Sequence, residues 1–150
     1  METIEIRPLR ASDRAAWDEL WDGYLRFYRH TLAAEVTDTT FRRLSEREDG
    51  MFALVAVGAD DVPVGFSHAL VHRSTWALTT YCYLEDLFVA PAARGRAAGH
   101  ALIEATAAEA KAQGSEQLYW RTEQFNAPAR KLYETVARLG PYVVYERELG

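Results

Sequence analysis

Apolar side chains recur along this chain at two spacings, one typical of helices and one typical of strands. Between residues 17 and 28 they recur every three or four positions, which predicts a helix whose first turn Ser12 or Asp13 can cap. Residues 51–57 form a nearly continuous apolar run, and a second run at 62–71 follows the turn Asp60-Asp61, so the two runs predict a hairpin of strands. The other predicted elements are a strand at 4–8, a helix from Thr37 or Asp38 to 49, a strand at 81–89, a helix at 97–113, a strand at 117–122, a helix at 126–139 and a last strand at 142–145.

This order of elements predicts a single mixed α/β domain over residues 1–150, with a central mixed β-sheet flanked by helices. At 150 residues the chain is long enough to bury a core of its own. Its 17 basic and 22 acidic side chains give a net charge of −5, which disfavours binding to nucleic acid. No signal peptide and no apolar run of membrane-spanning length is visible, so we expect a cytoplasmic protein without a membrane partner.

Cysteine and histidine give little indication of a metal or disulfide site. Cys82 is the only cysteine, so the chain forms no internal disulfide, and we expect its thiol to pack in a strand as a small apolar group. His68 and His72 are four residues apart, but in strand-like sequence this spacing does not pair them as it would on a helix. We therefore expect no metal ion.

A segment suited to binding an anion joins the strand at 81–89 to the helix at 97–113. Small residues let a phosphate approach the free N–H groups of a helix N-terminus, and Arg94 and Arg96 add positive charge. The same stretch is also compatible with a solvated turn before a closely packed helix. It contains neither a P-loop nor a Gly-x-Gly-x-x-Gly sequence, which disfavours nucleotide hydrolysis and hydride transfer. The residues expected around the phosphates are Arg94, Gly95, Arg96, Ala97, Ala98, Gly99 and His100.

This segment resembles motif A of the GNAT superfamily of acetyl-CoA-dependent N-acetyltransferases, in which [Gln/Arg]-x-x-Gly-x-[Gly/Ala] joins a strand to a helix. Here it reads Arg94-Gly-Arg-Ala97-Ala-Gly99, with alanine at position 97 where glycine is usual. The order of elements also matches the family, so the resemblance covers almost the whole chain. It implies a GNAT-like fold and acetyl-CoA as the co-substrate.

A second resemblance lies in Asn126-Ala-Pro-Ala129-Arg-Lys-Leu-Tyr133, which is similar to motif B of the same family, Asn-x-x-Ala-x-x-x-Tyr. The family's asparagine contacts the pantetheine arm and its tyrosine protonates the departing thiolate. The resemblance therefore implies that Asn126, Ala129 and Tyr133 contact CoA and that Tyr133 is a catalytic acid. Taken alone, Asn126 also suits a helix cap and Tyr133 a core position.

Three further segments, 119–123, 132–136 and 142–147, resemble the branch of this superfamily that includes the yeast histone and polyamine acetyltransferases and their bacterial relatives. Members of the superfamily often pair, which makes a homodimer an expectation here as well.

Acetyl transfer to an amine requires a base, because an ammonium group does not attack a thioester. Glu85 lies in the strand beside the expected cofactor, at a position where the resembling family often has its base. Adjacent strand residues point to opposite faces, so we assign Glu85 as the base and expect Asp86 to be bonded into the scaffold. Glu85 as an ion-pair partner of a nearby arginine stays open. Backbone N–H groups of Leu87, Phe88 and Val89 are expected to contact the cofactor and the developing oxyanion.

The acceptor site is the least determined part. Family analogy places the loop after the first helix over the acceptor, which brings in Tyr28, His30 and Glu35, and Glu123 ends a neighbouring strand. Aromatic faces and carboxylates suit an ammonium group, although Tyr28 also suits packing against the sheet. The sequence thus predicts an N-acetyltransferase that transfers acetyl directly from acetyl-CoA to a small-molecule or peptidic primary amine. The alternative is a CoA-binding sensor or interaction module without catalysis.

Overall fold

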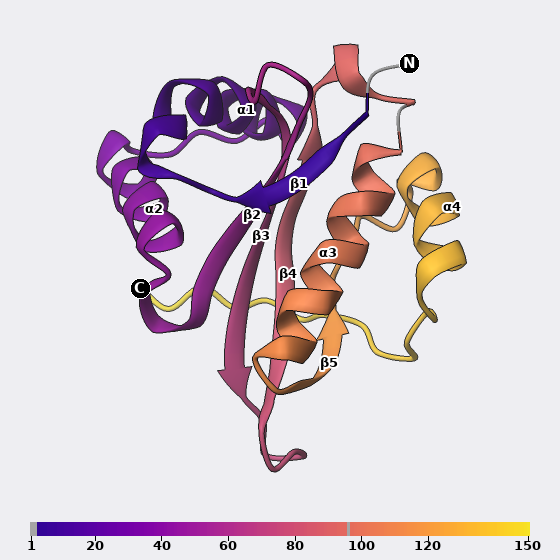
Figure 1. Cartoon of the computed structure of the whole chain (residues 1–150). Helices are drawn as coiled ribbons and strands as arrows, with labels where there is room; N and C mark the ends of the chain where they lie inside the picture. The colour runs from indigo at the N-terminus through magenta and orange to yellow at the C-terminus, as the bar shows by residue number, and fades with distance from the viewer. Residues whose placement is uncertain (1–2, 96) are drawn as a thin grey trace.

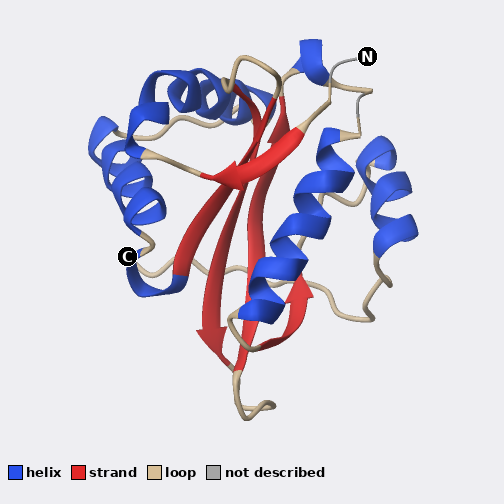
Figure 2. Cartoon of the chain, in the orientation of Figure 1, coloured by secondary structure: helices blue, strands red, loops and turns tan. Residues whose placement is uncertain are grey.

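The strands form one mixed sheet that has helices on both faces (Figure 1, Figure 2). The computed structural model describes residues 3–95 and 97–150. The sheet has five strands in the order β1-β2-β3-β4-β5, antiparallel from β1 to β4 and parallel between β4 and β5. A parallel pair needs a long crossover, and α3 provides it. The strands are β1 (Glu5–Pro8), β2 (Met51–Val57), β3 (Pro63–Arg73), β4 (Thr80–Val89) and β5 (Ser115–Tyr119).

The helices follow the predicted order as far as residue 136, which confirms the mixed α/β fold. They are α1 (Arg14–Phe27), α2 (Ala34–Glu46), α3 (Ala98–Ala112) and α4 (Ala127–Val136), with short 3-10 turns at Ala11–Asp13, Glu48–Gly50 and Pro91–Ala93. Helix α2 starts earlier than predicted, so Glu35 lies in its first turn rather than in a loop.

The predicted last strand at 142–145 is wrong. Residues 137–150 form neither helix nor strand, and the segment runs past the strands in Figure 1 with its apolar side chains exposed. A strand needs a paired neighbour, and within the described part of the chain no backbone hydrogen bond involves residues 138–150. An alternating apolar pattern is therefore not enough to make a strand here.

Strand β2 explains why its sequence is apolar at nearly every position. Ala53, Val55 and Val57 pack in the cluster under α1 and α2, while Phe52 and Leu54 pack in the cluster under α3. Both faces of the strand are covered, so alternation of apolar and polar residues disappears. These two clusters make up the core and hold the helices on their respective faces.

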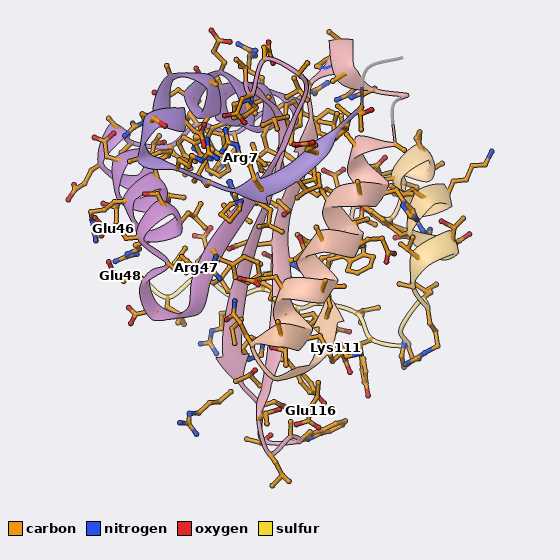
Figure 3. All side chains as sticks on the ribbon, viewed as in Figure 1. Arg7, Glu46, Arg47, Glu48, Lys111 and Glu116 are labelled. Carbon is orange, nitrogen blue, oxygen red and sulfur yellow. The ribbon has the colours of Figure 1, made fainter. Side chains whose placement is uncertain are left out.

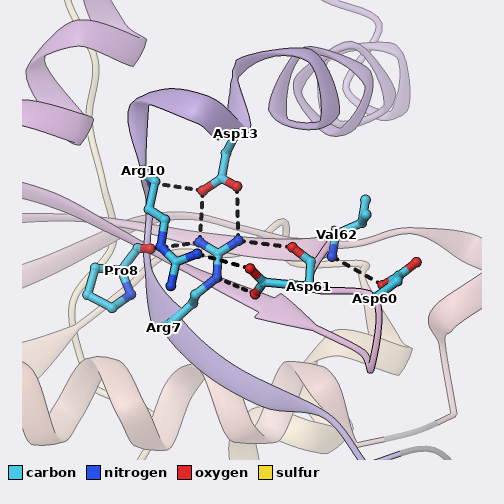
Figure 4. A network of polar contacts seen from close by, with 7 residues as sticks. All are labelled: Arg7, Pro8, Arg10, Asp13, Asp60, Asp61 and Val62. Atoms are coloured by element: carbon cyan, nitrogen blue, oxygen red, sulfur yellow. Dashed lines mark hydrogen bonds and ion pairs between the residues drawn. The ribbon is translucent and has the colours of Figure 1, made fainter.

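A network of charges joins the start of the chain to the turn between β2 and β3 (Figure 4). The guanidinium of Arg7 donates to both carboxylate oxygens of Asp13 at 2.9 Å, and its Nε donates to Asp61 at 2.8 Å. The backbone N–H of Arg10 also donates to Asp13, at 2.7 Å. Asp13 does not cap α1 with its side chain as the sequence suggested, because its carboxylate is committed to Arg7.

A second charged contact joins the end of α2 to α3 at the opposite end of β2. Arg47 follows α2 in the left-handed conformation, pairs with Glu109 of α3, and holds its guanidinium 5.2 Å from the ring centre of Phe52. Figure 3 shows Arg47 beside Glu46 and Glu48 at the edge of the molecule. Among residues 3–95 and 97–150, no helix has the length and apolar character needed to cross a bilayer.

The Arg7–Asp13 pair makes stability depend on pH. Burial acts to raise the pKa of Asp13, but the hydrogen bonds from Arg7 and Arg10 outweigh it and hold that pKa below its ordinary value. This stabilisation is present above the unfolded-state pKa of about 3.9 and is lost as the pH falls through the lower folded-state pKa. We expect Asp13→Asn to cost about 2 kcal/mol of unfolding free energy at neutral pH, and much less near about pH 2, in denaturant titrations.

Asp18→Asn is the matched control, because Asp18 pairs with Arg14 in an exposed i,i+4 contact at 2.8 Å. It should change stability little at either pH. Equal losses for the two variants, or a loss from Asp13→Asn that does not depend on pH, would contradict this account.

Candidate active site

Strand β4 contains one residue more than the stretch of β3 that it pairs with. His68 pairs with Asp86 and Ala69 pairs with Leu84, which leaves Glu85 as the extra residue of a β-bulge. Such a bulge re-aims the side chains around it. Strict alternation, from which the sequence argument placed Glu85 and Asp86 on opposite faces, does not hold at this point.

The sequence carries a weak signal of this bulge. The side chains that pack under α3 are at an even position before it, Cys82, and at an odd position after it, Leu87. On the other face, Phe88 packs in the cluster under α1. Because apolar residues occupy both faces of β4, this change of parity is hidden among them.

Asp86 is bonded into the scaffold, as predicted. One carboxylate oxygen accepts a hydrogen bond from the hydroxyl of Tyr24 at 2.7 Å, and the other lies 2.9 Å from Nδ1 of His68. The indole N–H of Trp17 donates to Nε2 of His68 at 3.1 Å, so Nδ1 carries the ring proton and donates it to Asp86. His68 is buried, and this chain of hydrogen bonds fixes α1 against β3 and β4.

Glu85 reaches solvent beside this network, and its surroundings favour the protonated form. Partial removal from water is the largest cause of the raised pKa of Glu85, and the charge of Asp86 adds to it. The charge of Arg121 acts in the opposite direction. A carboxyl with a raised pKa is a stronger base than an ordinary glutamate, which suits proton removal.

Strands β4 and β5 diverge next to Glu85. Their pairing ends where Tyr83 meets Tyr119, so the rest of β4 has no strand partner on that side among the residues described. Leu87, Phe88 and Val89 lie in this part of β4. The divergence leaves one edge of β4 without a paired strand, which the predicted hydrogen bonds from these N–H groups to the cofactor require.

The N-terminus of α3 faces the end of β4 after a short turn. Its first backbone hydrogen bond runs from the N–H of Ala101 to the carbonyl of Ala97, so the N–H groups of Ala98, Gly99 and His100 have no partner within the helix. Within the described ranges, no side chain caps them. Such a helix start can accept an anion, as the predicted binding of the CoA phosphates requires.

The turn before α3 depends on left-handed backbone positions. Gly95 has a φ of +86°, and no atom lies within 4 Å of where its Cβ would be. Arg94 is exposed but folds back onto the end of β4: its Nε donates to the carbonyl of Val89 at 3.1 Å, and its guanidinium lies 5.8 Å from the ring centre of Phe88. The predicted contribution of Arg96 lies outside the described residues.

Helix α4 presents the second motif. Asn126 caps it by accepting the N–H of Ala129 at 3.4 Å, and Tyr133 lies with its ring edge against Trp120 at 5.4 Å between centres. Burial raises the pKa of Tyr133, and the nearby Tyr28 raises it further. The hydroxyl is therefore protonated at neutral pH and able to donate.

Of the predicted acceptor residues, the structure brings two together. Burial raises the pKa of Tyr28, and the charges of Glu123 and Asp86 raise it further, so both carboxylates act on Tyr28 electrostatically. His30 and Glu35 are exposed, and among the residues described no hydrogen bond or ion pair joins their side chains to this group.

Two residues of this region were not predicted to be part of the site: His68 and Arg121. For Tyr24, at the end of the first helix, the sequence suits either the acceptor site or packing against the sheet, and its partner Asp86 is 62 residues away in sequence. The spacing of His68 and His72 predicts no metal pair, and the partners of His68 in the structure are an indole and a carboxylate. Long-range contacts of this kind leave no local pattern in a sequence.

Comparison with known proteins agrees with this geometry. The model of the Acetyltransferase (GNAT) family matches residues 15–137, which is most of the chain. D-amino-acid N-acetyltransferase HPA3 of Saccharomyces cerevisiae is 31% identical over 147 residues, covering 97% of this chain and 91% of the relative. The chain belongs to the GNAT family. It is an acetyl-CoA-dependent N-acetyltransferase.

Other relatives of this GNAT acetyltransferase point the same way. The uncharacterized N-acetyltransferase YhfO of Bacillus subtilis is 29% identical over 131 residues, covering 87% of each chain. Among solved structures, AAC(6')-Iy in complex with a bisubstrate analog of CoA and acetylneamine superimposes with a TM-score of 0.83, at 18% identity and 99% coverage of both chains. At that identity the superposition supports the fold.

Ala97 allows a test of the left-handed turn before α3. It adopts a φ of +60° at the position where the family usually has glycine, and an L-residue pays for that conformation. We expect Ala97→Gly to leave stability unchanged or raise it by up to about 1 kcal/mol in thermal melts, because the strain is removed. The KM for acetyl-CoA should stay the same or fall.

Ala108→Gly is the control, since Ala108 lies in the middle of α3 and is exposed. There the same substitution should cost about 1 kcal/mol. If Ala97→Gly cost as much as the control, the left-handed position would not be a source of strain.

Proposed function

We propose that this GNAT acetyltransferase transfers acetyl directly from acetyl-CoA to a primary amine while both are bound. The carrying observation is that β4 diverges from β5 beyond Tyr83 and leaves Glu85, the extra residue of a bulge, exposed beside the bonded carboxylate of Asp86. Electrostatic interactions link Tyr28 to Asp86, Glu123 and Tyr133 in the same region. Such a group favours a cation, and the raised pKa of Glu85 favours removal of a proton from it.

In this proposal Glu85 is the general base. An alkyl amine has a pKa of about 10.4, so most of it arrives as ammonium and must lose a proton before it attacks. Glu85 takes that proton, and Asp86 and Glu123 supply negative charge that attracts the ammonium. The amine nitrogen then bonds to the thioester carbonyl carbon, and backbone N–H groups of Leu87 to Val89 are proposed to stabilise the oxyanion.

Tyr133 is the proposed general acid. The C–S bond breaks as the amide forms, and the hydroxyl of Tyr133 gives its proton to the sulfur. The nitrogen loses its second proton in the same step, and that proton returns Tyr133 to its hydroxyl form. An acetyl-cysteine route is not supported, because Cys82 is fully buried and burial raises the pKa of its thiol to about 11. At neutral pH only about one thiol in 10⁴ would be ionised.

For the CoA phosphates we propose the first-turn N–H groups of α3, from Ala98 to His100, together with Arg94, Gly95, Arg96 and Ala97. Asn126 and Ala129 are proposed to contact the pantetheine arm. The start of α3 supports this assignment, since among the residues described no side chain caps its first N–H groups, which lie at the positive end of the helix.

For the acceptor we propose a small molecule rather than a peptide. A relative is named for D-amino acids and a structural neighbour for an aminoglycoside, both small molecules with amino groups. We also propose that the chain belongs to the branch of the yeast histone and polyamine acetyltransferases and acts in the cytoplasm. We also propose a homodimer, with the exposed Trp76, Leu78 and apolar side chains at 142–145 as its candidate contacts.

Glu85→Gln tests the base. We expect kcat/KM for the amine to fall by about 10²-fold to 10³-fold, since glutamine cannot accept the proton. The wild-type profile of kcat/KM against pH should fall on the acid side at a pH above the ordinary glutamate value of about 4.3, because the pKa of Glu85 is raised. The variant should lack that acid limb.

The control is Glu134→Gln, an exposed carboxyl on α4. It should retain the wild-type rate and pH profile. A Glu85→Gln enzyme that keeps the acid limb would assign the limb to another group.

Tyr133→Phe tests the acid. We expect kcat to fall by about tenfold or more while the KM for acetyl-CoA changes little, because the hydroxyl acts on the leaving sulfur and the ring remains in place. Release of the CoA thiol follows the reaction. Tyr145→Phe, in the exposed segment at the end of the chain, is the matched control and should be silent; unchanged turnover in Tyr133→Phe would remove this residue from the mechanism.

A further inference from the structure

Arg121 lies on the same face of the sheet as the proposed acceptor site. Tyr83 alternates with Cys82, which packs under α3, so Tyr83 points to the face that α1 and α2 cover. The Nε of Arg121 donates to the hydroxyl of Tyr83 at 2.7 Å. Arg121 is therefore on the acceptor side of β4, one bulge away from Asp86.

Neighbouring rings hold this arginine in place. Tyr83 stacks on Tyr119 of β5 at 4.9 Å between ring centres, and the hydroxyl of Tyr119 lies 2.8 Å from Nε2 of His72. The row His72, Tyr119, Tyr83 and Arg121 thus runs across three strands toward Glu85. A guanidinium fixed through its Nε loses less freedom when it binds a ligand.

The two terminal nitrogens of Arg121 remain available. Within residues 3–95 and 97–150 they make no hydrogen bond and no ion pair closer than 4.0 Å. The bond to Tyr83 is the largest cause of the raised pKa of Arg121, and the charges of Glu146 and Glu85 add to it. Two parallel N–H donors are the arrangement that binds a carboxylate in a bidentate manner.

We infer that Arg121 binds the carboxylate of the acceptor, so that the acceptor is an amino acid rather than a simple amine. The inference rests on the proposed function, in which the amino group lies at Glu85. Glu85 follows Tyr83 by two positions on β4, and the charges of Glu85 and Arg121 act on each other, so the two groups flank one short stretch of the strand. A molecule whose amino and carboxylate groups share one carbon is suited to such a stretch, with the amino group toward Glu85 and the carboxylate toward Arg121.

A different role for Arg121 makes a different prediction. If it served only to balance the charge of Glu85, its removal would change the pH profile for every amine to the same extent. If it binds a carboxylate, its removal affects only acceptors that have one.

The test uses pairs of amines that differ only in the α-carboxylate, namely D- and L-phenylalanine against 2-phenylethylamine, and D- and L-leucine against 3-methylbutylamine. We expect the wild type to prefer at least one enantiomer of each amino acid. Arg121→Gln should raise the KM for that amino acid by about tenfold or more and leave the KM for the matching amine and for acetyl-CoA unchanged. Arg121→Lys should recover part of the loss, and Arg73→Gln, an exposed arginine at the end of β3, should match the wild type.

Binding keeps the inference testable without turnover. We expect the N-acetyl amino acid formed from the preferred enantiomer, or both N-acetyl enantiomers if no amine reacts, to bind the protein–CoA complex about tenfold more weakly after Arg121→Gln in calorimetric titrations. Equal affinities, or equal effects on the amino acid and its decarboxylated partner, would overturn the role of Arg121. A wild type that acetylates no amine but shows the binding difference would overturn the proposed acceptor chemistry and leave the carboxylate site standing.

Discussion

The extra residue in β4 is the constraint on which the site depends. Because Glu85 has no partner on β3, the strand changes register there, and Asp86 is turned toward α1 while Leu87 returns to the α3 side. The hydrogen bonds of Asp86 to Tyr24 and His68 then hold the bulge in one geometry. Without them an irregular strand next to a diverging neighbour would have little to fix it. Buried polar groups that are fully bonded thus define the position of a side chain that is itself accessible.

The same strand also determines where the cofactor can lie. Parallel pairing with β5 stops at Tyr83, and the chain leaves β4 through the turn that starts α3. The open edge of β4 and the start of α3 are consequently within about ten residues of each other in the sequence. This explains why so short a motif carries so much of the function.

Local patterns in the sequence predicted most elements and indicated both motifs, whereas contacts between distant residues were missed. The apolar run of β2 and the small residues before α3 are local patterns, because each reflects the structure of the segment in which it lies. The bulge depends on the register of β3, and the role of Asp13 depends on Arg7 in another element. The stretch at 142–145 would need a neighbouring strand to pair with, and among the described residues it has none. An alternating apolar pattern indicates which side chains a segment would bury as a strand, but whether the segment pairs depends on a neighbouring strand elsewhere in the chain.

Charge is distributed across the sheet in a way that keeps the two substrates apart. The carboxylates of Glu85, Asp86 and Glu123 lie on the side of α1, where they outnumber Arg121, whereas the free N–H groups at the start of α3 and the side chain of Arg94 lie beyond the end of β4. Phosphates placed among the carboxylates would be repelled, and an ammonium at a helix N-terminus would oppose the dipole. This distribution favours the approach of an ammonium group and of a phosphate to the diverging strands from opposite sides. In the proposed mechanism their reacting ends meet at the bulge, so electrostatics orients each substrate before any specific contact is made.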